Sequence, residues 1–388
     1  PKAGGARVIV DLLRSLFDYA ALDSLSFRAA MAAFTAFALA VLLGAPVIRW
    51  LRNHRVGENT DKTDAPELAR MAKEAGKDKT PTMGGSFLIG SLMVSVICWC
   101  DLGNLQVVLG LILVAGLGAV GFVDDYLKLM VAGSSGLSAR AKLVGQTIAV
   151  LFVVGGFAWY AHASGRYSLL DVYPPFLKEL RIPLGDTLLG TAVFVAFGWL
   201  VIAGTSNATN ITDGMDGLLA GCVILSASAL VVFCYVTGRS DWSFYLEVPY
   251  IPEAAEMSVV GAALIGSCLG FLWYNSHPAE VFMGDSGSLP IGGLLAWMAV
   301  VSKQELVLPL LGFVFFAELG SSALQTFWYR RSGGKRIFTM APIHHGLQTK
   351  GGIFRPGKAP WPETKIVIRA YIIAAVCAMA SLALLKVR

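Results

Sequence analysis

Two adjacent aspartates end an apolar run, and carboxylates placed in this way could bind a metal ion or a substrate. In the stretch GAVGFVDDYLKLM, Asp124 and Asp125 close the run, and Lys128 lies one helical turn beyond Asp124. An aspartate at the centre of a bilayer costs roughly 2.5 to 3.5 kcal/mol, and an acid at a helix C-terminus opposes the helix dipole. On a helix the two side chains point about 100° apart, so one could face a metal and the other a substrate. Lys128 could pair with Asp124 or bind an anionic substrate, and the alternative for the aspartates is a solvated helix end.

A second polar stretch, NITDGMDG, repeats oxygen-bearing side chains at every third position. Asn210, Asp213 and Asp216 would share one face of a helical turn, and Gly214 and Gly217 would let the backbone approach a ligand. The spacing does not fit an EF-hand loop, which needs further oxygen ligands and a Glu at its twelfth position. The alternative is a polar turn between two apolar segments. Because the stretch has no Lys or Arg to neutralise it, the pattern favours a binding role.

A third aspartate site lies in VFMGDSGSLP, where Asp285 stands among glycines and serines. Hard cations take oxygen ligands, and Mg²⁺ often shares its coordination sphere with substrate phosphates. With no cluster of cations expected beside the five aspartates, the sequence predicts a bound divalent metal. The predicted ligand is Asp285, and the further candidates are Asp124, Asp125 and Asp213.

Two adjacent histidines, His344 and His345 in PIHHGL, are candidates for chemistry of their own. Near neutral pH they could donate to a phosphate or move a proton, and the alternative is zinc binding, although no cysteine accompanies them. His277, in NSHPAE, is ambiguous.

The composition predicts that these polar stretches belong to a membrane protein. The chain has 388 residues, is 55% hydrophobic and 15% charged, and its mean hydropathy is +0.64; an ordinary soluble domain has about 25% charged residues. Apolar runs recur along the whole chain, which predicts one integral membrane domain over residues 1–388. The net charge of +5 resides in loops beside apolar runs, as in membrane topology rather than nucleic-acid binding. The six cysteines lie in apolar segments without metal-site spacing, so we expect them to serve packing.

The predicted fold is all-α and polytopic, with about ten transmembrane helices of roughly 17 to 25 residues each. The predicted spans are 28–50, 83–100, 105–123, 143–162, 187–204, 217–237, 258–275, 288–302, 305–328 and 366–385. Lysines and arginines concentrate in the loops after the first, third and ninth spans, which places those loops in the cytoplasm and both termini outside it. Segment 1–27 then lies outside and lacks the features of a signal peptide, whereas 329–365 forms a long cytoplasmic loop. All the polar motifs fall in cytoplasmic loops, which predicts an active site at the cytoplasmic face.

The motifs TPTMGG, DDYLK, NITDGMDG, YNSHPAEVFMGDSGSLPIGG and APIHHGLQ, in this order, resemble those of a known family. The family is that of the phospho-N-acetylmuramoyl-pentapeptide transferases, MraY-type translocases within the polyprenyl-phosphate sugar-1-phosphate transferase superfamily. The resemblance runs from about residue 25 to the C-terminal LALLKVR. It implies transfer from UDP-N-acetylmuramoyl-pentapeptide to undecaprenyl phosphate, with release of UMP, in the bacterial cytoplasmic membrane. It also implies periplasmic termini, a Mg²⁺ cofactor and a homodimer.

The resemblance also implies roles for individual residues. Asp285 corresponds to the Mg²⁺ ligand, Asp124 and Asp125 to the essential acidic pair, and His344 and His345 to the histidine motif of the family. Phe282 would stack on uracil. The positions that match the substrate site are Lys77, Lys128, Lys142, Asn210, Asp213, Gly214, Met215, Asp216, Asn275 and Phe282.

The sequence departs from the family pattern at three places. The family commonly has three histidines followed by an aromatic or aliphatic residue and Glu, whereas His345 is followed here by Gly346, Leu347 and Gln348. An insertion, TKGGIFRPGKAPW, comes next, and the segment LARMAKEAGKDK before TPTMGG is long and charged. We expect these departures to change loop shape and to leave the aspartates intact.

The expected mechanism is attack of one phosphate on another, which requires neutralised charge and in-line alignment. Asp285 would hold Mg²⁺ on the pyrophosphate, Lys128 would cradle the nucleotide, and Asp124 would position or deprotonate the lipid phosphate. A covalent route through an aspartate stays open. The alternatives are an N-acetylglucosamine-1-phosphate transferase and a transporter, although transporters place ionisable groups near the bilayer midplane and use internal repeats that this sequence does not show.

Overall fold

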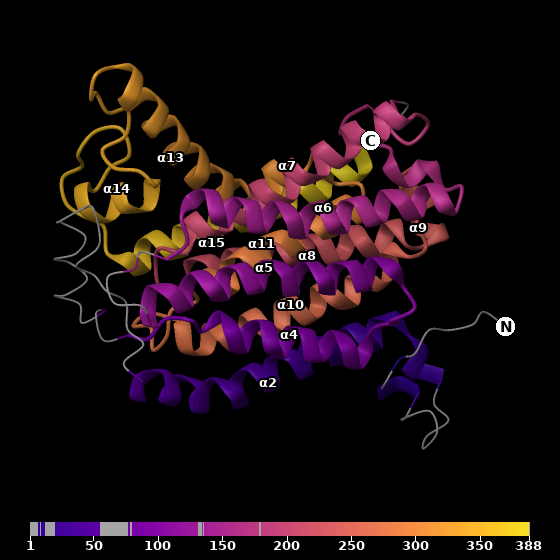
Figure 1. Ribbon diagram of the computed structural model, residues 1–388, viewed down its shortest axis with the longest axis horizontal. Helices are drawn as coiled ribbons and strands as arrows, with labels where there is room; N and C mark the ends of the chain where they lie inside the picture. The colour runs from indigo at the N-terminus through magenta and orange to yellow at the C-terminus, as the bar shows by residue number, and fades with distance from the viewer. Residues whose placement is uncertain are drawn as a thin grey trace.

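The computed structural model describes residues 20–54, 77, 80–130, 134, 136–177 and 180–387, together with residue 7 and residues 9–11. Long helices lying side by side form the body of the molecule (Figure 1). The long helices are α2 (Leu25–Asn53), α4 (Gly85–Trp99), α5 (Leu105–Met130), α6 (Ala139–Ala163), α7 (Leu188–Thr212), α8 (Leu218–Thr237), α10 (Ala254–Asn275), α11 (Asp285–Val301), α13 (Phe313–Arg331) and α15 (Glu363–Val387). The short ones are η1 (Ala20–Asp23), η4 (Tyr167–Leu170), α9 (Ser240–Leu246), α12 (Leu308–Leu311) and α14 (Ile343–Lys350).

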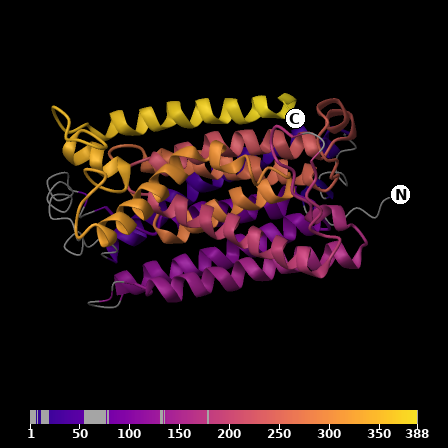
Figure 2. The same cartoon turned by 90° about the horizontal axis from the view of Figure 1, so that it is seen from above.

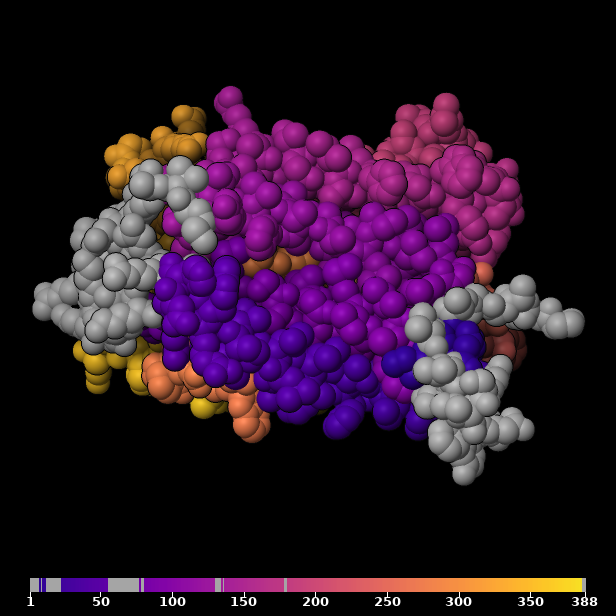
Figure 3. Space-filling view, turned by 60° about the horizontal axis from the view of Figure 1, so that its bottom comes forward, coloured from indigo at the N-terminus to yellow at the C-terminus, as the bar shows by residue number. Residues whose placement is uncertain are grey.

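The structure confirms an all-helical, polytopic membrane protein. In the part of the chain that the structure describes, seven helices are long and apolar enough to cross a bilayer, namely α2, α5, α6, α7, α8, α10 and α15. Helices α4 and α11 are apolar but shorter. Helix α2 begins, and α15 ends, at the same end of the bundle (Figures 1 and 2). The face in Figure 3 is covered by the indigo α2 and the purple to magenta helices α4 to α6.

Two helices are longer than the hydropathy pattern predicts. Helix α7 continues past residue 204 to Thr212, and α5 continues past residue 123 to Met130. In α7 the polar residues stay helical because the hydroxyls of Thr205, Thr209 and Thr212 each donate to the carbonyl four residues earlier, at 2.7, 3.0 and 2.8 Å. Asp124 and Asp125 therefore lie on α5, as their expected position on a helix requires, and Asn210 lies on α7; the predicted span ends at residues 123 and 204 are too early.

The predicted span 305–328 is also wrong as a single helix. Gly312 separates α12 from α13. In Figure 1, α13 tilts away from the other long helices, and α14 lies below it on the same side of the molecule. The histidine motif therefore lies on the short helix α14 rather than on a loop.

Helix α11 is the central element for the site. Every residue from Ser286 to Val301 is buried, and α11 packs against α4, α5 and α7. Small residues allow this close packing, as is common among membrane helices. A side chain at Gly85 would collide with the backbone of Gly287, and one at Gly121 would collide with the backbone of Asp285. The first residue of α11 is therefore held directly against α5.

Candidate active site

The aspartates Asp124, Asp125 and Asp285 meet where α5 and α11 adjoin. Each offers one carboxylate oxygen, and these oxygens lie within 4.8 Å of one another. Asp124 and Asp125 are buried, and Asp285 is partly exposed. Three hard oxygen donors at this spacing fit a divalent cation such as Mg²⁺. The chemistry of the donor set therefore agrees with the predicted metal site.

The three carboxylates have different partners. Asp125 accepts hydrogen bonds from the backbone N–H groups of Asp285, at 3.2 Å, and Ser286, at 2.9 Å. A negative side chain that accepts from the first N–H groups of a helix stabilises the helix N-terminus. Asp125 thus fixes the start of α11, and both of its oxygens are already engaged.

Two lysines from different helices offset part of the negative charge of the three aspartates. Lys128 Nζ lies 2.5 Å from Asp124 Oδ2 and 3.0 Å from Asp285 Oδ2, and Lys142 Nζ lies 2.7 Å from the same Asp285 oxygen. The Asp124 to Lys128 pair confirms the predicted pairing across one helical turn. The expectation that no cation cluster accompanies the aspartates is wrong, because α6 brings Lys142 to them from a separate part of the sequence.

Asn210 completes the ring around Asp285. Its Nδ2 donates to Asp285 Oδ1 at 2.5 Å and to Ser288 Oγ at 2.9 Å, and its Oδ1 accepts from Lys142 Nζ at 3.2 Å. Asp285 is therefore held at both oxygens by groups from α5, α6 and α7. The site can bind phosphate oxygens through its two ammonium groups and a metal through its carboxylates.

The predicted common face of Asn210, Asp213 and Asp216 does not form. Helix α7 ends at Thr212, Asp213 is its C-terminal cap, and Gly217 has a φ of +78° before α8 begins. Asn210 therefore contacts Asp285, whereas Asp216 faces a second cluster. Gly214 is exposed, and Met215 is buried.

The second cluster consists of Lys77, Asp216, His277 and Glu363. Lys77 Nζ lies 2.6 Å from Asp216 Oδ1 and 2.8 Å from Glu363, and His277 Nδ1 lies 2.9 Å from Asp216 Oδ2. Burial would raise the pKa of Asp216, but the hydrogen bond and charge of Lys77 lower it below its usual value. Burial would lower the pKa of Lys77, whereas Glu363 and Asp216 raise it. The structure thus brings two predicted substrate residues, Lys77 and Asp216, together in an ion pair. The expectation that no cation lies near Asp216 is also wrong.

The PTMGG motif runs beside the segment that carries Phe282. Phe282 donates its N–H to Pro81 and accepts at its carbonyl from Gly84, both at 2.8 Å. Lys77 Nζ lies 5.9 Å from the centre of the Phe282 ring, a distance at which the ring attracts the cation. Asn275 is buried and accepts from the N–H of Gly217 at 3.0 Å, so it braces the loop.

The two histidines lie at the start of α14. His344 is buried, and its Nδ1 lies 3.2 Å from Glu318 Oε2 on α13. The ring centres of His344 and His345 are 4.2 Å apart. Burial and the neighbouring His344 lower the pKa of His345 to about 3, so His345 is neutral near pH 7.

Two residues that contact the predicted site residues, Glu318 and Glu363, were not predicted from the sequence. Glu318 is the one acid in the apolar stretch FVFFAELGSS, and an acid isolated among apolar residues is a signal of function. Glu363 precedes the last apolar run. Its contact with Lys77 depends on the fold and could not be predicted from the sequence. The charged segment LARMAKEAGKDK lies outside the described residues except for Lys77.

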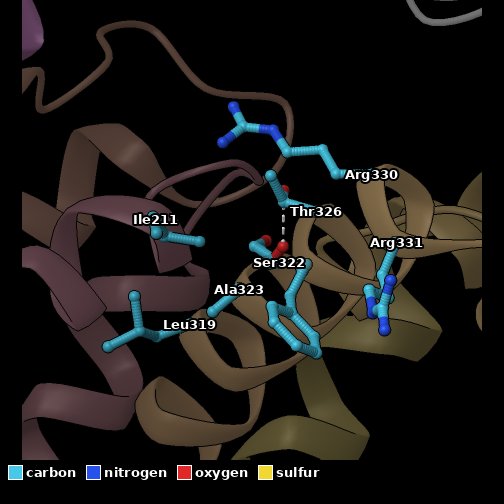
Figure 4. Close-up of a pocket in the computed structure, with 8 residues that line it drawn as sticks. Ile211, Leu319, Ser322, Ala323, Thr326, Arg330 and Arg331 are labelled. Carbon is cyan, nitrogen blue, oxygen red and sulfur yellow. Dashed lines mark hydrogen bonds between the residues drawn. The ribbon is translucent and has the colours of Figure 1, made fainter.

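An apolar cavity of about 640 Å³ lies between the end of α7 and α13 (Figure 4). Ile211, the residue after Asn210, forms one wall. The opposite wall belongs to α13, with Leu319 and Phe327 on its apolar part and Arg330 at its edge. An apolar cavity with a cationic edge suits an amphiphile with an anionic head.

The fold and the site are those of a membrane-embedded transferase, and residues 107–303 match the family described as glycosyl transferase family 4. Curated relatives narrow this class. A phospho-N-acetylmuramoyl-pentapeptide-transferase of Granulibacter bethesdensis is 39% identical over 376 residues, covering 97% of this chain and 96% of that protein. One of Neisseria gonorrhoeae is 40% identical over 365 residues, covering 94% of each. The chain therefore belongs to the phospho-N-acetylmuramoyl-pentapeptide transferase family.

Proposed function

We propose that the aspartate site transfers phospho-N-acetylmuramoyl-pentapeptide from its UDP-linked donor to undecaprenyl phosphate and releases UMP. The chain is then the enzyme that makes the first lipid intermediate of peptidoglycan synthesis. The observation that carries this proposal is the joint contact of Asp285 with Lys128 and Lys142 beside Asp124. Carboxylates for a metal and ammonium groups for phosphates at the end of apolar helices suit a reaction between a lipid phosphate and a soluble nucleotide.

In the proposed reaction, an oxygen of undecaprenyl phosphate forms a bond to the β-phosphorus of the donor. The bond from that phosphorus to the bridging oxygen breaks, and UMP leaves with the electron pair. Mg²⁺, when held by Asp285 and Asp124, would neutralise charge on the pyrophosphate. Lys128 and Lys142 bind phosphate oxygens, Asp124 positions or deprotonates the lipid phosphate, and Asp125 keeps α11 in place. The two-step route through an aspartyl intermediate is the alternative.

We propose that the nucleotide occupies the space around Phe282 and the loop that follows α7. Phe282 would stack on uracil, while Lys77, Asp213, Gly214 and Asp216 would surround the nucleotide-sugar. The Lys77 contact with Phe282 supports this assignment. The histidines of α14 would then reach the sugar side of the donor.

We place the lipid acceptor in the cavity beside α13. Ile211, which lines the cavity, follows Asn210 in the sequence, and Asn210 contacts Asp285, so we expect isoprenoid units bound there to bring their phosphate to the aspartates. Arg330 at the cavity edge would attract the anionic head. Substituting Phe327 by Asp is expected to raise the KM for undecaprenyl phosphate and to leave the KM for the UDP donor unchanged; the reverse pattern would remove the lipid from this cavity.

The proposed topology is one domain over residues 1–388 with ten crossings, periplasmic termini and a cytoplasmic active site. Segment 1–27 would be periplasmic, although it lies partly outside the described residues, and 329–365 would be cytoplasmic. The positions of the α2 start and the α15 end at one end of the bundle support an even number of crossings. Cysteine accessibility in intact cells tests this: a cysteine at Arg331 should react only after permeabilisation, and one at Tyr245 in either condition.

The proposed location is the bacterial cytoplasmic membrane, and the proposed assembly is a homodimer, as the family resemblance implies. Light scattering of the purified protein in nanodiscs should give the mass of two chains. A mass of one chain with full activity would refute the dimer.

A substrate comparison separates the proposed function from its alternatives. Purified protein with Mg²⁺ and undecaprenyl phosphate should release UMP from UDP-N-acetylmuramoyl-pentapeptide and not from UDP-N-acetylglucosamine. Release only from the second donor would show the N-acetylglucosamine-1-phosphate transferase. Release from neither, with uptake of nucleotide into vesicles, would show the transporter.

A further inference from the structure

We infer that Glu318 is a positioning residue that fixes the orientation and tautomer of His344, so that the imidazole Nε2 accepts a hydrogen bond from the nucleotide-sugar. The inference rests on the proposed function for the identity of the substrate. Glu318 takes no part in the proposed reaction itself, and the inference gives a function to this acid in an apolar stretch.

The first observation is the surroundings of Glu318. The residue lies in the first half of α13, its side chain is 9% exposed, and apolar residues precede it in the sequence. A buried carboxylate needs hydrogen-bond donors to offset the loss of water. Glu318 Oε2 accepts from the backbone N–H of His344 at 3.3 Å and lies 3.2 Å from the Nδ1 of the same residue. Both contacts of this oxygen therefore go to one residue of α14.

The second observation is the state of the His344 ring. His344 is 1% exposed, and in the described part of the chain neither ring nitrogen has a fully aligned hydrogen bond. Nδ1 nevertheless lies within ion-pair distance of Glu318, and hydrogen bonds in active sites often align only when the substrate binds. An acceptor beside Nδ1 selects the tautomer with the proton on Nδ1, which leaves a lone pair on Nε2.

The third observation is where Nε2 points. A side chain at Gly214 would collide with Nε2 of His344, so this nitrogen lies against the backbone of the loop that follows α7. Gly214 is itself exposed, and Asp213 and Asp216 flank it. A buried nitrogen without a hydrogen bond at an open loop suits a donor on a ligand, such as a sugar hydroxyl or amide N–H. His344 would therefore accept from the donor substrate rather than bind its phosphates.

The test uses the tautomer of His344 as a readout that does not depend on activity. The chain has five histidines, so the ¹⁵N-histidine spectrum of the protein in nanodiscs is simple, and His344→Gln assigns the signal. We expect wild-type His344 with the proton on Nδ1 and a shift toward the Nε2–H form in Glu318→Leu. Ser321→Ala, a change on the same helix that leaves the carboxylate in place, should keep the wild-type spectrum. An Nε2–H tautomer in the wild type, or no shift in Glu318→Leu, would overturn the inference.

Kinetics give a second readout. Loss of one hydrogen bond from the substrate corresponds to about a tenfold change in affinity. We expect Glu318→Leu to raise the KM for the UDP donor about tenfold with an unchanged KM for undecaprenyl phosphate, and Glu318→Asp to recover part of the loss. Equal losses for both substrates would indicate a merely structural role and refute the inference.

Gly214→Ala is a second test that can be used if the Glu318→Leu protein does not fold. The added methyl group would occupy the place of Nε2 on an exposed loop, so we expect weaker binding of the UDP donor with the fold retained. Unchanged binding would show that Nε2 does not face the substrate. Wild-type protein that releases no UMP would refute the proposed function alone, since the tautomer experiment still reports on Glu318.

Discussion

Asp125 accepts a hydrogen bond from the backbone N–H of Asp285 at 3.2 Å, so one member of the acidic pair holds the helix that carries the third aspartate. Asp125 and Asp285 differ in what their side chains contact. Asp285 has its side chain directed at cations and Asn210, whereas Asp125 has its side chain directed at a helix N-terminus.

Substitution of the two aspartates should therefore have different consequences. Asp285→Asn is expected to abolish turnover and leave the melting temperature within a few degrees of the wild type. Asp125→Ala should lower the stability by about 1 kcal/mol, as for the loss of a helix N-cap, and should lower kcat through displacement of α11. Thermal unfolding and UMP release measure both effects. An unaltered melting temperature in Asp125→Ala would contradict the capping role.

Lys142 should matter for phosphate binding and not for metal binding. Its Nζ lies 2.7 Å from Asp285 Oδ2, so Lys142→Met removes a positive charge next to the metal ligand. By Coulomb's law, affinity for a divalent cation should stay equal or increase, whereas kcat should fall about 100-fold through loss of one charge-stabilising donor. Mn²⁺ titration by electron paramagnetic resonance measures the first effect, with the exposed Arg140→Gln as the matched control on α6. Loss of Mn²⁺ binding in Lys142→Met would contradict this assignment.

His345 should make the protein less stable as the pH falls. Burial and His344 lower its pKa to about 3 in the folded chain, against about 6.5 in an unfolded chain. The unfolded state therefore binds more protons between these values, and stability decreases as the pH falls from about 6.5 toward 3, by at most about 1.4 kcal/mol per pH unit for this group. Melting temperatures from pH 7.5 to 4.5 should fall less steeply in His345→Gln. Parallel curves for both proteins would refute the buried neutral histidine.

Gly346 stands where the family commonly has a third histidine, and the structure shows why a side chain does not fit there. A Cβ at Gly346 would lie 2.9 Å from Thr339 Oγ1 and 3.0 Å from the carbonyl oxygen of Met340. Thr339 in turn donates its hydroxyl to the carbonyl of Gly352, at 2.5 Å, in the inserted stretch. The insertion thus occupies the space beside α14.

Gly346→Ala should accordingly destabilise the protein. The matched control is Gly320→Ala on α13, where a Cβ would meet nothing within 4 Å and where a helical alanine gains about 0.5 to 1 kcal/mol over glycine. Thermal unfolding should move in opposite directions for the two variants. A stabilised Gly346→Ala would show that the loop adapts to a side chain.

Local features of the fold follow from the sequence. The apolar runs predicted the helices, and the pairing of Lys128 with Asp124 followed from helical spacing. The contacts of Lys142 and Lys77 could not be predicted, because helix packing brings each to an aspartate more than a hundred residues away. The end of α7 was misplaced because threonine hydroxyls bond within the helix and keep a polar segment helical. The isolation of Glu318 among apolar residues is visible in the sequence. Its contact with His344 depends on the fold and could not be predicted.

The central claim is that Asp285 and its two lysines transfer a phosphorylated sugar to a lipid phosphate. The most direct measurement is the stoichiometry of UMP and lipid-linked product formed by the protein in vesicles that contain undecaprenyl phosphate, Mg²⁺ and UDP-N-acetylmuramoyl-pentapeptide. We predict one lipid product for each UMP with the wild type and neither product with Asp285→Asn. UMP formed without the lipid product, or equal turnover by Asp285→Asn, would contradict the claim.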